Sequence, residues 1–264
     1  MDTLEDRARR LLAGRPGAPP LQRRVEIMIS GPLKRVGVVR QSLDDLQRQL
    51  LSEAGRNGDN LQLRVTAFLD GCRHTTPWSN RPIDAGASTN PWHCFQGQTR
   101  YAEAFQHSYN EQERIDAIIM FGDRFDDAPL PTMEIAAQLR DRGTKIFAFH
   151  VGGDRTSRFA YEQLAQQSGG VSVQLSDEQS FAGVLTVITD YLFRPAETLR
   201  ALPAAPNNPD VKALVDRLKA LPPPSMPMPI PALSKPALAI KLPPLPPPVA
   251  AVAASPWDRP ARKV

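Results

Sequence analysis

The sequence of 264 residues lacks any long hydrophobic run and holds only two cysteines, Cys72 and Cys94. Its longest apolar runs, such as 117–122 and 146–152, are far shorter than the ~20 residues that a membrane-spanning helix needs. The N-terminal residues mix acidic and basic side chains and lack the apolar stretch of a secretory signal. We therefore predict a cytoplasmic protein that has no membrane partner and whose thiols are reduced.

Glycine is absent from residues 195–264, although this segment holds 18 of the 27 prolines. This segregation excludes one uniform globule, because proline without glycine favours a semi-rigid polyproline II segment. We predict an N-terminal arm over 1–24, a folded domain over 25–194 and a Pro-rich, largely disordered tail over 195–264. Apolar side chains at helical spacing predict one short helix in the tail, over 210–221.

The net charge of +4 suggests a basic protein, but the excess of positive charge is confined to the two ends of the chain. The predicted domain carries 17 basic and 21 acidic side chains. Nucleic-acid binding requires lysine and arginine clustered on a folded face, so we predict no nucleic-acid partner. The basic tail is interpreted as a solvated linker or as a docking segment in which Trp257 is the anchor.

Hydrophobic patterning over 25–194 alternates between strand and helix. The strand patterns cover 25–31, 61–69, 115–121, 144–151 and 171–175, and the helical patterns cover 33–52, 99–113, 132–142, 158–168 and 179–193. A short edge strand is expected around Trp78. This order predicts an α/β fold with a doubly wound, mostly parallel six-stranded sheet and helices on both faces.

A sheet of this kind binds ligands at the loops after the carboxyl ends of its strands, near the point where the strand order reverses. Small and polar residues that suit such loops follow the predicted strands or precede a helix. The binding residues that we predict there are Ser30, Gly31, Thr99, Asp123 and Gly152.

Three segments resemble the von Willebrand factor A domain, in particular its small bacterial stand-alone versions. They are Val25–Gly31 before a long helix, Gly97–Ala104 at the start of a helix, and Ile118–Asp127 after a central strand. The resemblance covers roughly residues 25–194. It implies a Rossmann-like fold and a role in binding partner proteins.

Domains of this family bind a divalent ion, and the resemblance implies three ligands here. Ser30 matches the first serine of the Asp-x-Ser-x-Ser turn, Thr99 the threonine and Asp123 the second aspartate. Met28 stands where the first aspartate belongs, and Pro32 replaces the second serine. Mg²⁺ prefers oxygen ligands in near-octahedral geometry. A single carboxylate would compensate only part of its charge.

Two hypotheses about this site stay open. In the first, the metal site is degenerate: Ser30 and Thr99 cap helices, and Asp123 accepts backbone hydrogen bonds in a turn. In the second, Mg²⁺ binds and a partner's carboxylate completes its shell, with help from Asp126 or Asp127 in the following loop.

A second group of metal-type side chains consists of two thiols and two imidazoles: Cys72, His74, His93 and Cys94. These side chains suit tetrahedral zinc, but two of them are adjacent in sequence and can hardly aim at one ion. A zinc site, an oxidisable thiol pair and ordinary half-buried residues are all open hypotheses. Trp78 and Trp92 flank this loop and either cover the sheet edge or form a contact surface.

Sequence signatures of enzymes are absent, including Gly-x-Ser-x-Gly, the phosphate-binding loop with lysine and Gly-x-Gly-x-x-Gly. His150 lies in an apolar run and is interpreted as a core histidine. We predict a non-enzymatic protein-interaction module, an adaptor that uses its sheet-end loops and its Pro-rich tail. The alternatives are Mg²⁺-dependent partner binding through Ser30, Thr99 and Asp123, and a hydrolase with Ser30 or a cysteine as nucleophile.

Overall fold

The structure is a computed structural model, and it describes the predicted domain together with one helix that follows it. The described residues are 21–30, 36–69, 72–84, 99–151, 154–175, 178–195, 198 and 208–221. Several predictions concern residues outside these ranges: the arm before residue 21, the tail after residue 221, and the residues Gly31, Trp92, His93, Cys94, Gly152 and Trp257.

The described strands form one six-stranded sheet with the order β3-β2-β1-β4-β5-β6. Their bounds are β1 Gln22–Ser30, β2 Asn60–Leu69, β3 Cys72–Thr75, β4 Ala117–Gly122, β5 Lys145–His150 and β6 Ser172–Gln174. β3 runs antiparallel to β2, and the other neighbours pair in parallel. The predicted doubly wound, mostly parallel six-stranded sheet is confirmed.

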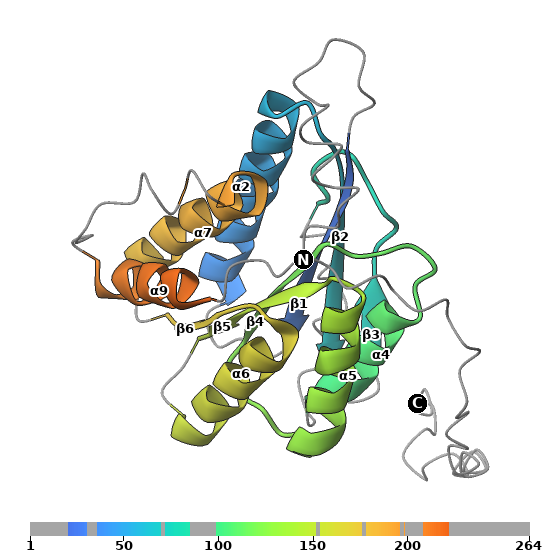
Figure 1. The fold of residues 1–264 in the computed structure, drawn as a ribbon, viewed down its shortest axis with the longest axis vertical. Helices are drawn as coiled ribbons and strands as arrows, with labels where there is room; N and C mark the ends of the chain where they lie inside the picture. The colour runs from blue at the N-terminus through green and yellow to red at the C-terminus, as the bar shows by residue number, and fades with distance from the viewer. Residues whose placement is uncertain are drawn as a thin grey trace, which may run out of the picture. The chain divides into compact units, whose positions relative to one another are not determined.

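Helices cover both faces of the sheet (Figure 1). Their bounds are α2 Val36–Arg56, α4 Tyr101–Tyr109, α5 Pro129–Asp141, α6 Arg155–Ser168, α7 Glu178–Phe193 and α9 Pro209–Ala220. α2, α7 and α9 pack on one face, and α4, α5 and α6 pack on the other. Among the helices in the described part of the chain, none is long and apolar enough to span a bilayer.

The central strands are buried on both faces, as expected for a parallel sheet between two helix layers. Side chains alternate along β1, so Ile27 and Ile29 enter the core under α2 and α7. Met28, between them, enters the core under α4, α5 and α6. The strand therefore reads as a nearly continuous apolar run, and its two faces belong to different cores.

Several element bounds differ from the sequence prediction. β1 begins at Gln22 rather than Val25, because residues 22–24 already pair with β2. The edge strand is β3, and near Trp78 the chain makes only an isolated bridge, between Leu63 and Ser79.

Two helices differ in length from the prediction because side chains cap their ends. α6 starts at Arg155 rather than at 158, since Asp154 accepts hydrogen bonds from Thr156 N and Ser157 N. α4 ends at Tyr109 rather than at 113, where the Arg142 guanidinium donates to the carbonyls of Tyr109 and Glu111.

The predicted helix over 210–221 is present as α9. Asn208 caps it by accepting hydrogen bonds from Asp210 N and Val211 N. Its buried side chains include Leu214 and Leu218, which join the core formed by α2 and α7. The folded domain therefore extends past residue 194 and includes this helix.

Candidate functional site

The strand order reverses between β1 and β4, and this is where a doubly wound sheet places its ligand site. Ser30 ends β1, Asp123 directly follows β4, and Thr99 precedes α4. The structure thus brings the predicted residues Ser30 and Asp123 to neighbouring strand ends at the carboxyl edge of the sheet.

Two buried tyrosine side chains lie next to Ser30 at this edge of the sheet. Tyr101 Oη lies 2.8 Å from Ser30 Oγ and 2.5 Å from Tyr161 Oη, and it also lies 2.8 Å from the carbonyl oxygen of Arg124. We call Ser30, Tyr101 and Tyr161 the hydroxyl cluster. All three side chains are buried, and they join β1, α4, α6 and the loop after β4.

Gly122, the last residue of β4, makes room for this cluster. A Cβ atom at this position would fall within 2.5 Å of the hydroxyl oxygens of Ser30, Tyr101 and Tyr161. The glycine is therefore required by close packing of side chains rather than by an unusual backbone angle.

The hydroxyl cluster is electrically neutral. Burial raises the pKa of Tyr101 and that of Tyr161 well above the usual value for tyrosine, so both phenols keep their protons at neutral pH. Phe125 stacks on the Tyr101 ring with 4.7 Å between ring centroids. The cluster therefore consists of uncharged hydroxyl oxygens that are surrounded by aromatic rings.

Thr99 does not cap a helix. Two aspartates accept hydrogen bonds from the backbone N–H groups at the start of α4 instead. Asp126 Oδ2 accepts a hydrogen bond from Thr99 N, and Asp127 Oδ2 accepts one from Ala102 N at 2.8 Å. Asp126 N in turn donates to Thr99 Oγ1. Burial raises the pKa of Asp127. The loop after β4 is therefore bound to the start of α4 by its own carboxylates.

His150 is a buried histidine at the end of β5. Its Nε2 lies 3.1 Å from the carbonyl oxygen of Asp123, an acceptor, so this nitrogen carries the proton. Burial lowers the pKa of His150 and keeps the ring neutral. The contact orients the ring toward the backbone of Asp123, whereas Ser30 Oγ is hydrogen-bonded to Tyr101.

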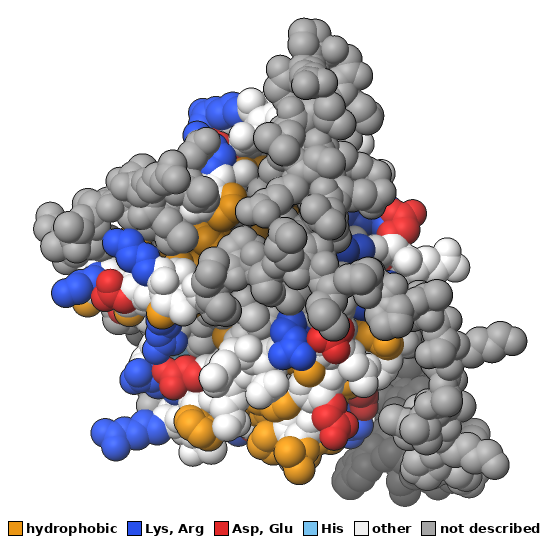
Figure 2. Space-filling model, viewed as in Figure 1, with side chains coloured by type: hydrophobic (Ala, Val, Ile, Leu, Met, Phe, Trp, Pro, Cys, Tyr) orange, Lys and Arg blue, Asp and Glu red, His pale blue; other side chains and the backbone are white. Residues whose placement is uncertain are grey.

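Two large apolar side chains are exposed beside this edge, and the sequence analysis missed both. Leu130, at the start of α5, is 77% exposed, and Phe159, in the first turns of α6, is 61% exposed. Helices that follow parallel strands begin at the carboxyl edge, so both side chains lie near it. Figure 2 shows hydrophobic side chains on the lower part of the face where Figure 1 draws α5 and α6.

Comparison with known proteins gives matches only at the level of structure: no family model and no curated protein matches the chain. The von Willebrand factor type A structure from Catenulispora acidiphila matches with a TM-score of 0.50 and 12% identity, over 66% of this chain and 43% of its own. The chain has the von Willebrand factor A fold.

A second solved structure with a similar fold is the pilus adhesin SpaC from Lactobacillus rhamnosus GG. It matches with a TM-score of 0.53 and 10% identity, over 68% of this chain and 31% of its own. Our chain thus spans less than half the length of either matching chain. At such identities the likeness concerns the fold alone.

The likeness to von Willebrand factor A domains implies a divalent ion near Ser30, Thr99 and Asp123, and among these three side chains only Asp123 is a carboxylate. Met28, at the position of the first aspartate, is fully buried in the apolar core. Ser30 Oγ is bonded to a neutral phenol, and Thr99 Oγ1 lies 3.4 Å from Asp126 Oδ2. Within the described ranges, no three His, Cys, Asp or Glu side chains form a group that could hold a metal.

The thiol and imidazole group can be followed only in part. His74 is exposed on β3, where its backbone pairs with Ala67. Trp78 is half-buried, and its ring lies over the guanidinium of Arg64 at 4.5 Å. It covers the sheet edge, which agrees with one of the two interpretations. His93, Cys94 and Trp92 lie outside the described residues, as does the side chain of Cys72.

A buried group of charged residues under α4 was not predicted. Glu26 accepts hydrogen bonds from Arg64 Nη2 at 2.9 Å, Thr66 Oγ1 at 2.6 Å and Ser108 Oγ at 2.7 Å. Arg64 also pairs with Glu111. Alternation along β1 places Glu26 on the face opposite to Val25 and Ile27. From the sequence alone, a charged residue in this pattern is expected to face solvent. α4 covers that face, so the charge is buried and needs its partners.

Proposed function

We propose that this domain is a non-enzymatic protein-interaction module, which binds a partner protein at the carboxyl edge of its sheet without a metal ion. The single observation that carries the proposal is the neutral, buried hydroxyl cluster at the strand-order reversal. It occupies the usual ligand position of the fold with internally satisfied groups, so binding has to use the surface around it.

The exposed side chains of Leu130 and Phe159 are the best candidates for that surface. Single exposed apolar residues are common, but two at the starts of adjacent helices can act as neighbouring anchors. The matching structure SpaC is a pilus adhesin, which supports a binding role.

The absence of catalysis is also part of the proposal. A nucleophile needs a base within hydrogen-bonding distance. His150 Nε2 is bonded to the Asp123 carbonyl, and Ser30 Oγ is bonded to Tyr101. In keeping with the sequence analysis, we propose a cytoplasmic adaptor in which the Pro-rich tail contacts a second partner.

The experiment is affinity capture with the full chain as bait, performed once with Mg²⁺ and once with EDTA, followed by quantitative mass spectrometry. We expect the same specific partner in both conditions. The double variant Leu130→Ser/Phe159→Ser should lose it. The control Lys219→Ser, on an exposed position of α9, should retain it. Capture that requires Mg²⁺, or capture that survives the double variant, contradicts the proposal.

A further inference from the structure

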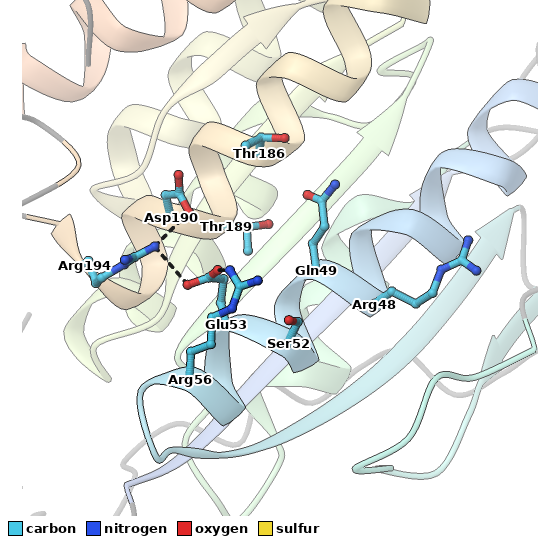
Figure 3. Close-up of a pocket in the computed structure, with 9 residues that line it drawn as sticks. All are labelled: Arg48, Gln49, Ser52, Glu53, Arg56, Thr186, Thr189, Asp190 and Arg194. Carbon is cyan, nitrogen blue, oxygen red and sulfur yellow. Dashed lines mark hydrogen bonds and ion pairs between the residues drawn. The ribbon is translucent and has the colours of Figure 1, made fainter. Parts of the chain in front are cut away.

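α2 and α7 pack side by side and leave between them a cavity of about 530 Å³ (Figure 3). We call it the α2–α7 cleft; residues 48–56 of α2 and residues 186–194 of α7 and its end line it. Its volume lies within the roughly 300–1,000 Å³ of small-molecule sites. The lining residues are all polar or charged, so the cleft suits a polar ligand.

The cleft is remote from the carboxyl edge. Arg23, near the start of β1, donates a hydrogen bond to the carbonyl of Leu192 at 3.2 Å. The end of α7 therefore lies beside the amino ends of the strands. A ligand in the cleft would not compete with a partner at the opposite edge of the sheet.

One end of the cleft presents arginine donors. The buried carboxylate of Glu53, 8% exposed, pairs with Arg56 and with Arg194 Nη2, the latter at 2.9 Å. Arg194 Nη2 also lies 3.4 Å from Asp190 Oδ1. Each guanidinium has five N–H donors, and these ion pairs use only one nitrogen of each. Both arginines line the cleft at helix ends, where the helix dipole favours a cation, and the side chain of Arg56 is largely exposed to solvent.

The middle of the cleft holds two buried polar atoms without a partner. Thr189 is 2% exposed, and its Oγ1 has no hydrogen-bond partner among the described residues. The same is true of Gln49 Oε1. Figure 3 shows the two side chains on opposite walls, one from α7 and one from α2. Burying an unpaired hydroxyl costs free energy that a valine of the same shape would avoid, which points to a ligand that supplies the missing bonds.

We propose that the α2–α7 cleft binds a small hydroxycarboxylate. Its carboxylate accepts hydrogen bonds from the unused N–H groups of Arg56 and Arg194. Its hydroxyl donates to Gln49 Oε1, which can only accept, and approaches Thr189 Oγ1, which can do both. The lining carries three arginines and two carboxylates, and Arg48 already pairs with Asp45 outside the lining, so the arginines available to an anion are Arg56 and Arg194.

The probes are L-malate and succinate, which differ by one hydroxyl, titrated into the full chain and followed by nuclear magnetic resonance. We expect malate to shift the Nε–Hε signals of Arg56 and Arg194 in a saturable way. Succinate should bind about three- to tenfold more weakly, because it lacks the group that meets Gln49 and Thr189. Absence of saturable shifts at these residues with malate overturns the proposal.

Two variants separate ligand binding from structure. Arg56→Gln should weaken malate binding at least about tenfold. Arg140→Gln, at a half-buried arginine on α5 that pairs with Asp141, should not change it. Thr189→Val should weaken malate about three- to tenfold and leave succinate unchanged. A Thr189→Val variant that gains thermal stability but binds malate as before shows a merely structural position and refutes the site.

Discussion

The hydroxyl cluster at the carboxyl edge of the sheet and the α2–α7 cleft both contain buried hydroxyl groups, and they differ in how those groups are paired. At the edge, the hydroxyls of Ser30, Tyr101 and Tyr161 bond to one another and to a backbone carbonyl. In the cleft, Thr189 and Gln49 each keep an atom without a partner in the described structure. The difference concerns the hydroxyl cluster rather than the whole edge, because His150 Nδ1 at the same edge also lacks a hydrogen-bond partner among the described residues. Paired hydroxyls hold their neighbours in place, whereas an unpaired buried hydroxyl can gain a bond from a ligand.

The largest effect should come from the buried charges on the same side of the sheet as the hydroxyl cluster. Arg64→Met leaves Glu26 buried without its cation and should lower the free energy of unfolding by about 3–5 kcal/mol, measured by urea denaturation. The double variant Glu26→Met/Arg64→Met should recover part of this loss. Equal losses in the single and double variants would show that the ion pair is not what matters.

Filling the space beside the hydroxyl cluster should be the next largest effect. Gly122→Ala places a methyl group against three hydroxyl oxygens and should cost about 3 kcal/mol of unfolding free energy. Gly55→Ala is the matched control, because a Cβ there meets nothing within 4 Å and the position is helical. The control should gain about 0.5–1 kcal/mol. A Gly122→Ala protein as stable as wild type contradicts the packing at this point.

A pH titration tests the buried histidine at the same edge. Since burial lowers the folded-state pKa of His150 below its unfolded value, the unfolded chain binds the proton first as pH falls. Stability should therefore be fully present above about pH 7 and decline by about 1 kcal/mol toward pH 5.5. His150→Gln should flatten this decline.

His107, whose pKa burial also lowers, contributes in the same direction and stays in both proteins. A decline unchanged by His150→Gln would assign it to other groups.

The cleft should respond in the opposite sense to the edge. Thr189→Val removes an unpaired buried hydroxyl and should raise the free energy of unfolding of the ligand-free protein by about 0.5–1 kcal/mol. The same measurement on Ser30→Ala should show a loss of about 1 kcal/mol, because that hydroxyl is bonded. If both changes are destabilising, the contrast between the two regions does not hold.

The smallest expected effect is that of a divalent ion. A site with a dissociation constant of ~50 µM would add about 2.7 kcal/mol of stability at ~5 mM Mg²⁺. We expect a shift in Tm of less than about 1 °C between Mg²⁺ and EDTA, measured by differential scanning calorimetry. A saturable rise that Asp123→Ala abolishes would restore the metal-dependent alternative.

Local sequence patterns were enough to predict much of the fold. Strand and helix periodicity predicted the six-stranded sheet, and the apolar spacing of 210–221 predicted α9. The strand ends placed Ser30 and Asp123 at the point where the strand order reverses. The caps were harder to see: Asp154 belongs to its own helix, but Asp126 and Asp127 cap α4 from a loop about 25 residues later in the chain.

The sequence by itself determined the order of strands and helices and the residues that end the strands, because these depend on spacing along the chain. Only the tertiary structure decided what surrounds those residues. Tyr101 and Tyr161 are 60 positions apart, yet their hydroxyls meet at Ser30. Glu26 is buried because α4 covers it, and Thr189 lacks a partner because α2 and α7 do not close the space between them. Such contacts join distant segments, and periodicity carries no information about them.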